Sequence, residues 1–116
     1  MASKNIPKNL NDCFVHLKTL LGTAEVRKIE TSSEKSMNTY HFGLGMHIRN
    51  EWGLWQGSKL AQWFNTQGIH HADDMSGIIL NSFWRHLHDH PIDLDKQVKF
   101  YQDYWKKQKE TDHESK

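Results

Sequence analysis

The segment from Tyr40 to Trp55, YHFGLGMHIRNEWGLW, constrains the fold of this chain more than any other. Its aromatic and aliphatic residues recur at intervals of three and four, the spacing that places side chains on one side of an α-helix. Apolar residues also occupy neighbouring positions and so cover much of the helix circumference. A helix of this kind is usually surrounded by others. The segment therefore predicts a central helix at about residues 34–52.

Two glycines, Gly43 and Gly45, lie inside this predicted helix. A glycine in a helix interior costs about 1 kcal/mol relative to alanine. Each glycine therefore needs a compensating reason, and we interpret both as points where the backbone of a packing partner approaches closely.

Four other segments show the same helical spacing, and turn residues or helix stops separate them. They span about residues 10–21, 58–67, 72–89 and 94–105, and residues 23–33 are interpreted as a connector. No stretch shows the alternation expected of a strand between turns. At 116 residues the chain is long enough for one core. The sequence predicts an all-α fold, a compact orthogonal bundle of four to six helices.

The predicted helical domain spans residues 9–107. Residues 1–8 are mostly polar, and we expect a flexible N-terminus there. Residues 108–116 are charged and have no apolar periodicity, which is typical of a disordered tail.

The net charge and apolar content of the chain exclude some classes of binding partner. The formal net charge is +1 with the nine histidines neutral, so no overall field attracts nucleic acid or an anionic membrane. No apolar run approaches the roughly 20 residues of a membrane span. The single cysteine, Cys13, excludes an internal disulfide framework and fits a reducing compartment. We expect a cytoplasmic protein that recognises its partner locally.

The first candidate site combines polar residues of the central helix with two carboxylates at the start of the 72–89 helix. Arg49 can pair with Asp73 or Asp74 and so join two helices, or it can contribute to a surface that binds a partner. Both interpretations stay open. The candidate binding residues are His41, Arg49, Asn50, Trp55, Asp73 and Asp74.

A second candidate is a metal site, because seven of the nine histidines lie between residues 37 and 92. His86 and His90 are four residues apart and can face the same way on a helix, where His70 and His71 would have to join them. No known zinc spacing is completed by a cysteine or carboxylate. Surface histidines with no ligand are the simpler interpretation, and a pH-sensing role stays open.

A third candidate is the six-residue segment RHLHDH, which begins at Arg85 and ends at His90. It resembles the R-x4-6-H motif of the HEPN ribonucleases, an all-helical family. The resemblance implies a dimer in which Arg85 and His90 activate an RNA 2′-hydroxyl without a metal. Other catalytic patterns are missing, since Gly43 and Gly45 do not form a phosphate loop and no serine lies in a strand-to-helix elbow. We expect no cofactor, and a binding protein rather than an enzyme.

Two blocks carry a wider resemblance. The H-F-G-L-G-x-x-I-R-N-x-W-G-L-W block is found here at residues 41–55, and the D-D-M-S-x-I-I-L block at residues 73–80. With these blocks, residues 6–107 resemble an uncharacterised bacterial domain family. The resemblance implies no established activity, although small proteins of this sort are common in toxin and defence loci.

The surplus of tryptophan and tyrosine, the residues enriched at protein interfaces, favours a protein-binding module. We expect a partner protein such as a cognate toxin, which this chain would neutralise as an immunity or inhibitor protein. The oligomeric state stays open.

Overall fold

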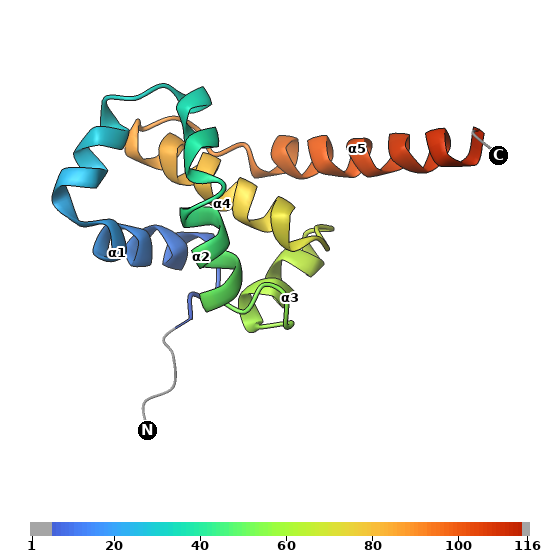
Figure 1. Ribbon diagram of the computed structural model, residues 1–116, viewed down its shortest axis with the longest axis horizontal. Coiled ribbons are helices and arrows are strands. Elements are labelled where there is room, and N and C mark those ends of the chain that lie inside the picture. Colours follow the sequence, from blue (N-terminus) through green and yellow to red (C-terminus); the bar gives the residue numbers. More distant parts are fainter. Residues whose placement is uncertain (1–5, 115–116) are drawn as a thin grey trace.

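The chain is all-α over the residues that its computed structural model describes, 6–114 for the backbone and 6–109 for the side chains (Figure 1). No strand occurs in that range. The prediction of an all-α bundle is confirmed. The helical segments, in chain order, are α1 (Leu10–Glu30), the 3-10 helix η1 (Glu34–Tyr40), α2 (Leu44–Glu51), α3 (Lys59–Thr66), α4 (Ala72–Leu87) and α5 (Leu94–Glu114).

The central helix of the bundle is α4. Eleven of its sixteen residues are buried, and α1, η1, α2, α3 and α5 all pack against it. Asp73 and Asp74 lie in its first turn, where carboxylates offset the exposed N–H dipoles. His88 caps its C-terminal end, and Asp89 follows in the left-handed region at φ 57°. The helix predicted at about residues 72–89 is confirmed, and it ends at Leu87.

The prediction of a central helix at residues 34–52 is wrong. The structure divides that range into η1, a turn and α2. In η1 the hydroxyls of Ser36 and Thr39 donate to backbone carbonyls three residues earlier, at 2.6 and 2.8 Å, and such local bonds compete with the α-helical ladder. Phe42 and Met46 are 80 % and 52 % exposed. These two apolar side chains therefore face solvent, and α2 is not surrounded by other helices.

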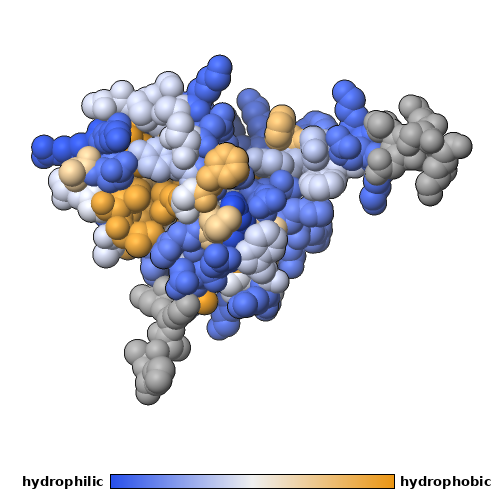
Figure 2. All heavy atoms as spheres, viewed as in Figure 1, coloured by the Kyte–Doolittle hydropathy of each residue, from blue (hydrophilic) through white to orange (hydrophobic). Residues whose placement is uncertain are grey.

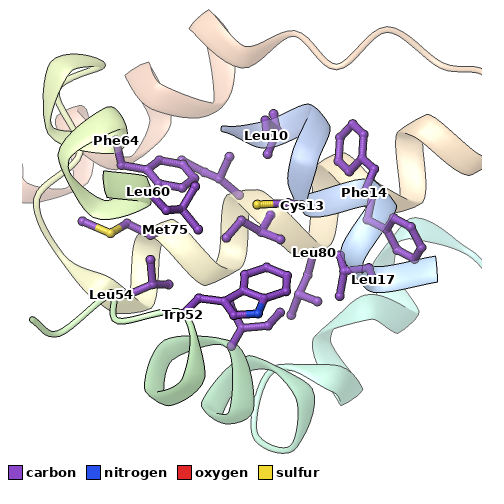
Figure 3. Packing of buried hydrophobic residues seen from close by; sticks show 14 of the residues in the cluster. Leu10, Cys13, Phe14, Leu17, Trp52, Leu54, Leu60, Phe64, Met75 and Leu80 are labelled. Atoms are coloured by element: carbon purple, nitrogen blue, oxygen red, sulfur yellow. The ribbon is translucent and has the colours of Figure 1, made fainter. Parts of the chain in front are cut away.

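The core lies where α1, α3, α4 and the end of α2 meet, and the labelled side chains of these elements converge in Figure 3. Phe64, Phe83 and Leu17 are among the largest fully buried side chains. Cys13 is also fully buried, and burial raises the pKa of its thiol. Since the thiolate is the reactive form, this cysteine is a packing residue.

The helix α1 is longer than the sequence predicts. Gly22, expected to end it, has φ 80° and produces a kink, after which the helix continues to Glu30. This second half contains the fully buried Ile29 and accepts a 2.6 Å hydrogen bond from the Tyr40 hydroxyl through Glu25. The residues predicted to form a connector are therefore mostly helical.

The chain ends also differ from the prediction. Residues 1–5 and 115–116 lie outside the described residues, but Pro7 is buried and Ile6 packs against the core. The helix α5 continues to Glu114, across most of the segment predicted to be a disordered tail. Its polar residues Lys106–Lys109 are strong helix formers with no glycine or proline to stop them.

The helix α5 packs against the bundle only as far as Trp105. Val98 is buried and Leu94 and Tyr101 are partly buried against the core, whereas Phe100 is 66 % and Tyr104 48 % exposed. The second half leaves the body of the protein (Figure 1). Among the described residues, no helix is long and apolar enough to cross a membrane.

Two phenylalanines allow a matched test of this packing. Phe83→Ala should lower the free energy of unfolding by about 3–5 kcal/mol, because Phe83 is fully buried and alanine leaves a cavity. Phe100→Ala should change it by less than about 0.5 kcal/mol, because Phe100 faces solvent. Urea unfolding followed by circular dichroism gives both values. Similar losses in the two variants would contradict the placement of α5.

Candidate functional site

Arg49 is a buried arginine that joins α2 to α4. Its side chain is 6 % exposed, and its Nη1 donates a 2.8 Å hydrogen bond to the Ser76 hydroxyl. Its Nε lies 3.3 Å from Oδ1 of Asp73. The two groups form an ion pair, but their geometry is not that of a hydrogen bond. Of the two interpretations left open, the geometry favours the structural one, with Asp73 rather than Asp74 as the carboxylate.

Gly45 makes room for this arginine. A Cβ atom at Gly45 would lie 3.1 Å from Arg49 Nη1 and 3.8 Å from Leu80 Cδ1. The nearest atom is thus in the Arg49 side chain, and the backbone carbonyl oxygen of Tyr40 in η1 follows at 3.6 Å, an ordinary van der Waals distance. Gly43 has no atom within 4 Å of its would-be Cβ, so the expected close approach does not occur there.

Asp74 joins α4 to α5. Its carboxylate accepts a 2.8 Å hydrogen bond from Trp105 Nε1, and the Trp105 ring stacks on His71 at a centroid distance of 4.0 Å. Burial raises the pKa of the Asp74 carboxyl, an effect that the Trp105 hydrogen bond and the nearby His71 partly oppose. This side chain is 9 % exposed, so its main role is to fix α5 on the body.

The remaining predicted binding residues lie apart from Arg49. Trp55 is 60 % exposed, and its Nε1 donates a 3.1 Å hydrogen bond to Asn50 Oδ1. His41 lines a cavity between η1 and α4. The six predicted residues therefore do not line one pocket. Arg49, Asp73 and Asp74 link helices, Asn50 and Trp55 form an exposed pair, and His41 lines the cavity between η1 and α4.

Arg85 is engaged by acidic partners. Its Nε lies 2.9 Å from Oε2 of Glu34 and its Nη1 3.6 Å from Oδ2 of Asp93. Its Nη1 also donates to the Pro91 carbonyl at 3.3 Å. An arginine that stabilises a phosphate in a HEPN-type site would need this charge free, so the geometry gives that hypothesis no support.

The histidines of the metal hypothesis do not converge. His71 stacks on Trp105 beside the first turn of α4, while His86 stacks on Phe14 in its last turn, at a centroid distance of 4.5 Å. Sixteen helical residues separate the two ends by about 24 Å. Within the described part of the chain, no group of three or more histidine, cysteine or acidic residues could hold a metal ion.

A comparison with protein families decides the classification. Residues 6–87 match the family described as Domain of unknown function (DUF6794). The chain belongs to this family. The DUF6794 match covers α1 to α4 and ends before α5. No curated protein and no solved structure matches the chain.

The structure also reveals a surface that the sequence prediction missed in this DUF6794 protein. Large apolar side chains of α1 and of the segment 42–46 are exposed, and apolar atoms gather over this side in Figure 2. A groove of about 330 Å³ between the two helices has Trp52 as its most deeply buried lining residue. We call this surface the α1–α2 face; it comprises Val15, Leu20, Met46 and the groove residues His16, Thr19, His47 and Trp52.

Leu20 belongs to the apolar pattern of the predicted helix 10–21, and Phe42 and Met46 to that of the predicted central helix, yet all three side chains are exposed. A sequence signal was present, however. Between Val15 and Leu20 the only charged residue is Lys18, and between Phe42 and Ile48 there is none. An uncharged run that is exposed on a surface helix is the pattern of an interface.

Arg49 is buried and its ion-pair partner Asp73 is exposed, so replacing each by alanine should lower the free energy of unfolding by different amounts. Arg49→Ala should lower the free energy of unfolding by about 2–4 kcal/mol, since it removes a buried side chain and the charged donor to Ser76. Asp73→Ala should cost at most about 1 kcal/mol, because the Asp73 side chain is 67 % exposed. Chemical denaturation measures both losses. An equal loss in the two variants would show that the ion pair, and not the buried bond to Ser76, holds α2 in place.

Asp74 should make stability depend on pH. Burial raises the pKa of the Asp74 carboxyl in the folded state above its value in the unfolded chain. The protonated carboxyl therefore contributes its full stabilisation at a pH below the unfolded pKa, and this contribution is lost as the pH rises through the folded pKa. Each unit of difference corresponds to about 1.4 kcal/mol. Asp74→Asn keeps an acceptor for Trp105, so its stability relative to wild type should increase between pH 3 and pH 7.

Thermal unfolding across that pH range checks this expectation. Asp103→Asn is the matched control, because Asp103 is an exposed carboxylate paired with Lys99 on the surface of α5. Its stability should follow the wild-type profile. A parallel course for Asp74→Asn and wild type would contradict the burial argument.

Proposed function

We propose that this DUF6794 protein is a non-enzymatic protein-binding module and that the α1–α2 face is its contact surface. The observation that carries the proposal is the exposure of large apolar side chains on two adjacent helices. Val15 is 64 %, Leu20 46 % and Met46 52 % exposed. An apolar surface of this kind on a small domain marks an interaction site.

The composition of the face supports a protein partner. Its groove is lined by Val15, Leu20 and Trp52 together with threonine and histidine, and none of its lining residues is an acid, a lysine or an arginine. Interface cores are depleted of charge and enriched in methionine and aromatic residues. The backbone on both sides is helical and rests on the core through Leu17 and Ile48, so little ordering entropy is lost on binding.

Trp55 supplies a further anchor on the segment after α2. Its indole is exposed, yet the 3.1 Å hydrogen bond to Asn50 restrains it. A tryptophan held in place loses less rotamer freedom when a partner covers it. Asn50 and Trp55, two of the binding residues predicted from the sequence, are therefore part of the proposed contact surface. Arg49 and Asp74 instead hold α2 and α5 against α4.

The contacts of Arg85 and of the histidines favour a binding role over the two alternatives. Arg85 is paired with Glu34 and Asp93, and no group of three or more histidine, cysteine or acidic residues in the described range could hold a metal ion. We propose a bacterial immunity or inhibitor protein that acts by covering a toxin or enzyme. A cytoplasmic location belongs to the same proposal, because the one cysteine is a buried thiol.

Charge placed on the α1–α2 face should abolish partner capture. The experiment immobilises the full chain, passes native host lysate over it and quantifies bound proteins by mass spectrometry. The double variant Val15→Lys with Met46→Lys should reduce recovery of the partner at least tenfold, since two lysines would be desolvated in the interface.

Tyr104→Lys is the matched control, because it places the same charge at an exposed aromatic on α5. It should capture the partner as wild type does. Circular dichroism confirms that each variant is folded. Recovery of the same partner by the double variant, or no stoichiometric partner for wild type, would refute the proposal.

A further inference from the structure

The groove of the α1–α2 face contains a hydrogen-bond donor that has no acceptor. Trp52 lines this groove and is only 6 % exposed, and its ring lies among the core side chains (Figure 3). Among the described residues the indole N–H has no hydrogen-bond acceptor, and its nitrogen is not one of the fully buried atoms without a partner. This N–H is therefore open to solvent in the groove.

A second tryptophan shows how unusual this is within the chain. Trp84 is 7 % exposed, almost the same as Trp52, and its Nε1 donates to the Ser32 carbonyl at 3.0 Å. A tryptophan N–H usually finds a hydrogen-bond partner when its side chain is buried. Trp84 finds that partner within its own chain, whereas Trp52 does not.

A partner that covers the α1–α2 face displaces the solvent from the Trp52 N–H. The lost hydrogen bond has to be replaced, because a donor that is buried without an acceptor weakens the complex. If the α1–α2 face is the contact surface proposed above, its partner therefore brings an acceptor to Trp52.

The side chains that line the groove favour an anionic acceptor. None of the six lining residues is acidic, and two of them are histidines, His16 and His47. His16 is held by a 2.8 Å hydrogen bond from its Nδ1 to the Asp12 carbonyl, and its ring stands edge-on to Trp52, with 75° between the two planes. An imidazole becomes a cation when it takes up a proton. A carboxylate that enters here meets a donor and two imidazoles and no like charge.

The chain already contains this combination of groups where α4 meets α5. There the Asp74 carboxylate accepts from Trp105 Nε1 at 2.8 Å, and His71 stacks on the Trp105 ring. Asp74 is 9 % exposed. A tryptophan N–H beside a histidine thus holds a carboxyl group largely out of solvent in this protein.

We infer that the partner protein inserts the carboxylate of an aspartate or glutamate into the groove of the α1–α2 face, where it accepts a hydrogen bond from Trp52 Nε1. The exposed apolar side chains of Val15, Leu20 and Met46 contact the apolar residues around that acid and exclude water. A charge-assisted hydrogen bond is strong in such surroundings. The acid is therefore the residue of the partner on which recognition of this chain depends.

A peptide selection tests the nature of the acceptor. Random twelve-residue peptides displayed on phage are selected against the full chain, and only those that fail to bind the variant Val15→Lys with Met46→Lys are kept. One carboxylate cannot pair with both added ammonium groups, so this variant still leaves a desolvated charge in the interface. We expect the retained peptides to contain an acid between apolar residues. Replacing the acid by its amide should weaken binding about tenfold in isothermal titration.

Trp52→Phe removes the indole N–H and keeps an aromatic ring in the groove. In this variant the exchange of acid for amide should change Kd by less than about threefold, because the donor is missing and the two changes are coupled. Trp84→Phe is the matched control, since it makes the same change at an equally buried tryptophan outside the groove. It should retain the full wild-type loss.

A measurement on the wild-type chain is independent of any folding defect in the variants. On titration with a retained peptide, the indole N–H resonance of Trp52 should shift in NMR spectra, and that of Trp84 should not. Retained peptides without an acid, an unshifted Trp52 resonance, or an equal loss in wild type and Trp52→Phe would overturn the inferred carboxylate and leave the contact surface in place. If no selected peptide depends on the α1–α2 face, the proposed function is refuted and the carboxylate with it.

Discussion

The requirement to bury α4 on nearly all sides determines how the rest of the chain is arranged. Met75, Ser76, Gly77 and Ile78 are buried at four successive positions and so lie around the whole circumference of α4, which therefore needs neighbours on nearly all sides. Five segments supply them, and specific hydrogen bonds also hold α2, α5 and the turn after α1 in place. Arg49 bonds α2 to Ser76, Trp84 bonds the end of α1 through the Ser32 carbonyl, and Trp105 bonds α5 to Asp74.

The helices were predictable from the sequence, but their roles were not. Three- and four-residue spacing identifies a helix because the side-chain period belongs to the helix itself. Burial depends on which other elements pack around it, and this is not local information. The segment around Phe42 and Met46 has the apolar density of a central helix, yet α4 takes that position and leaves those side chains in solvent.

Helix ends that depend on local chemistry were predicted better than those that depend on tertiary contacts. Ser58 caps α3 as expected, and its hydroxyl accepts from the Ala61 N–H at 3.2 Å. Gly22 has a positive φ of 80°, but its ψ of 169° is extended, so it produces a kink and not a helix stop, and the helix continues to the buried Ile29.

For the candidate site, the sequence supplied an acidic partner for Arg49 without choosing between Asp73 and Asp74. It gave no signal for the cavity between α4 and the start of α5, whose walls come from segments about 60 residues apart in the chain.

The position of α5 determines which part of the surface can change in sequence without disturbing the core. The DUF6794 match ends at residue 87, so the cavity of about 450 Å³ between α4 and the start of α5 has one wall from a helix outside the matched residues. The fully buried core side chains all precede that helix. Substitutions on the exposed side of α5, at Phe100 or Tyr104, would therefore reshape the surface beside α4 and leave the fully buried core in place.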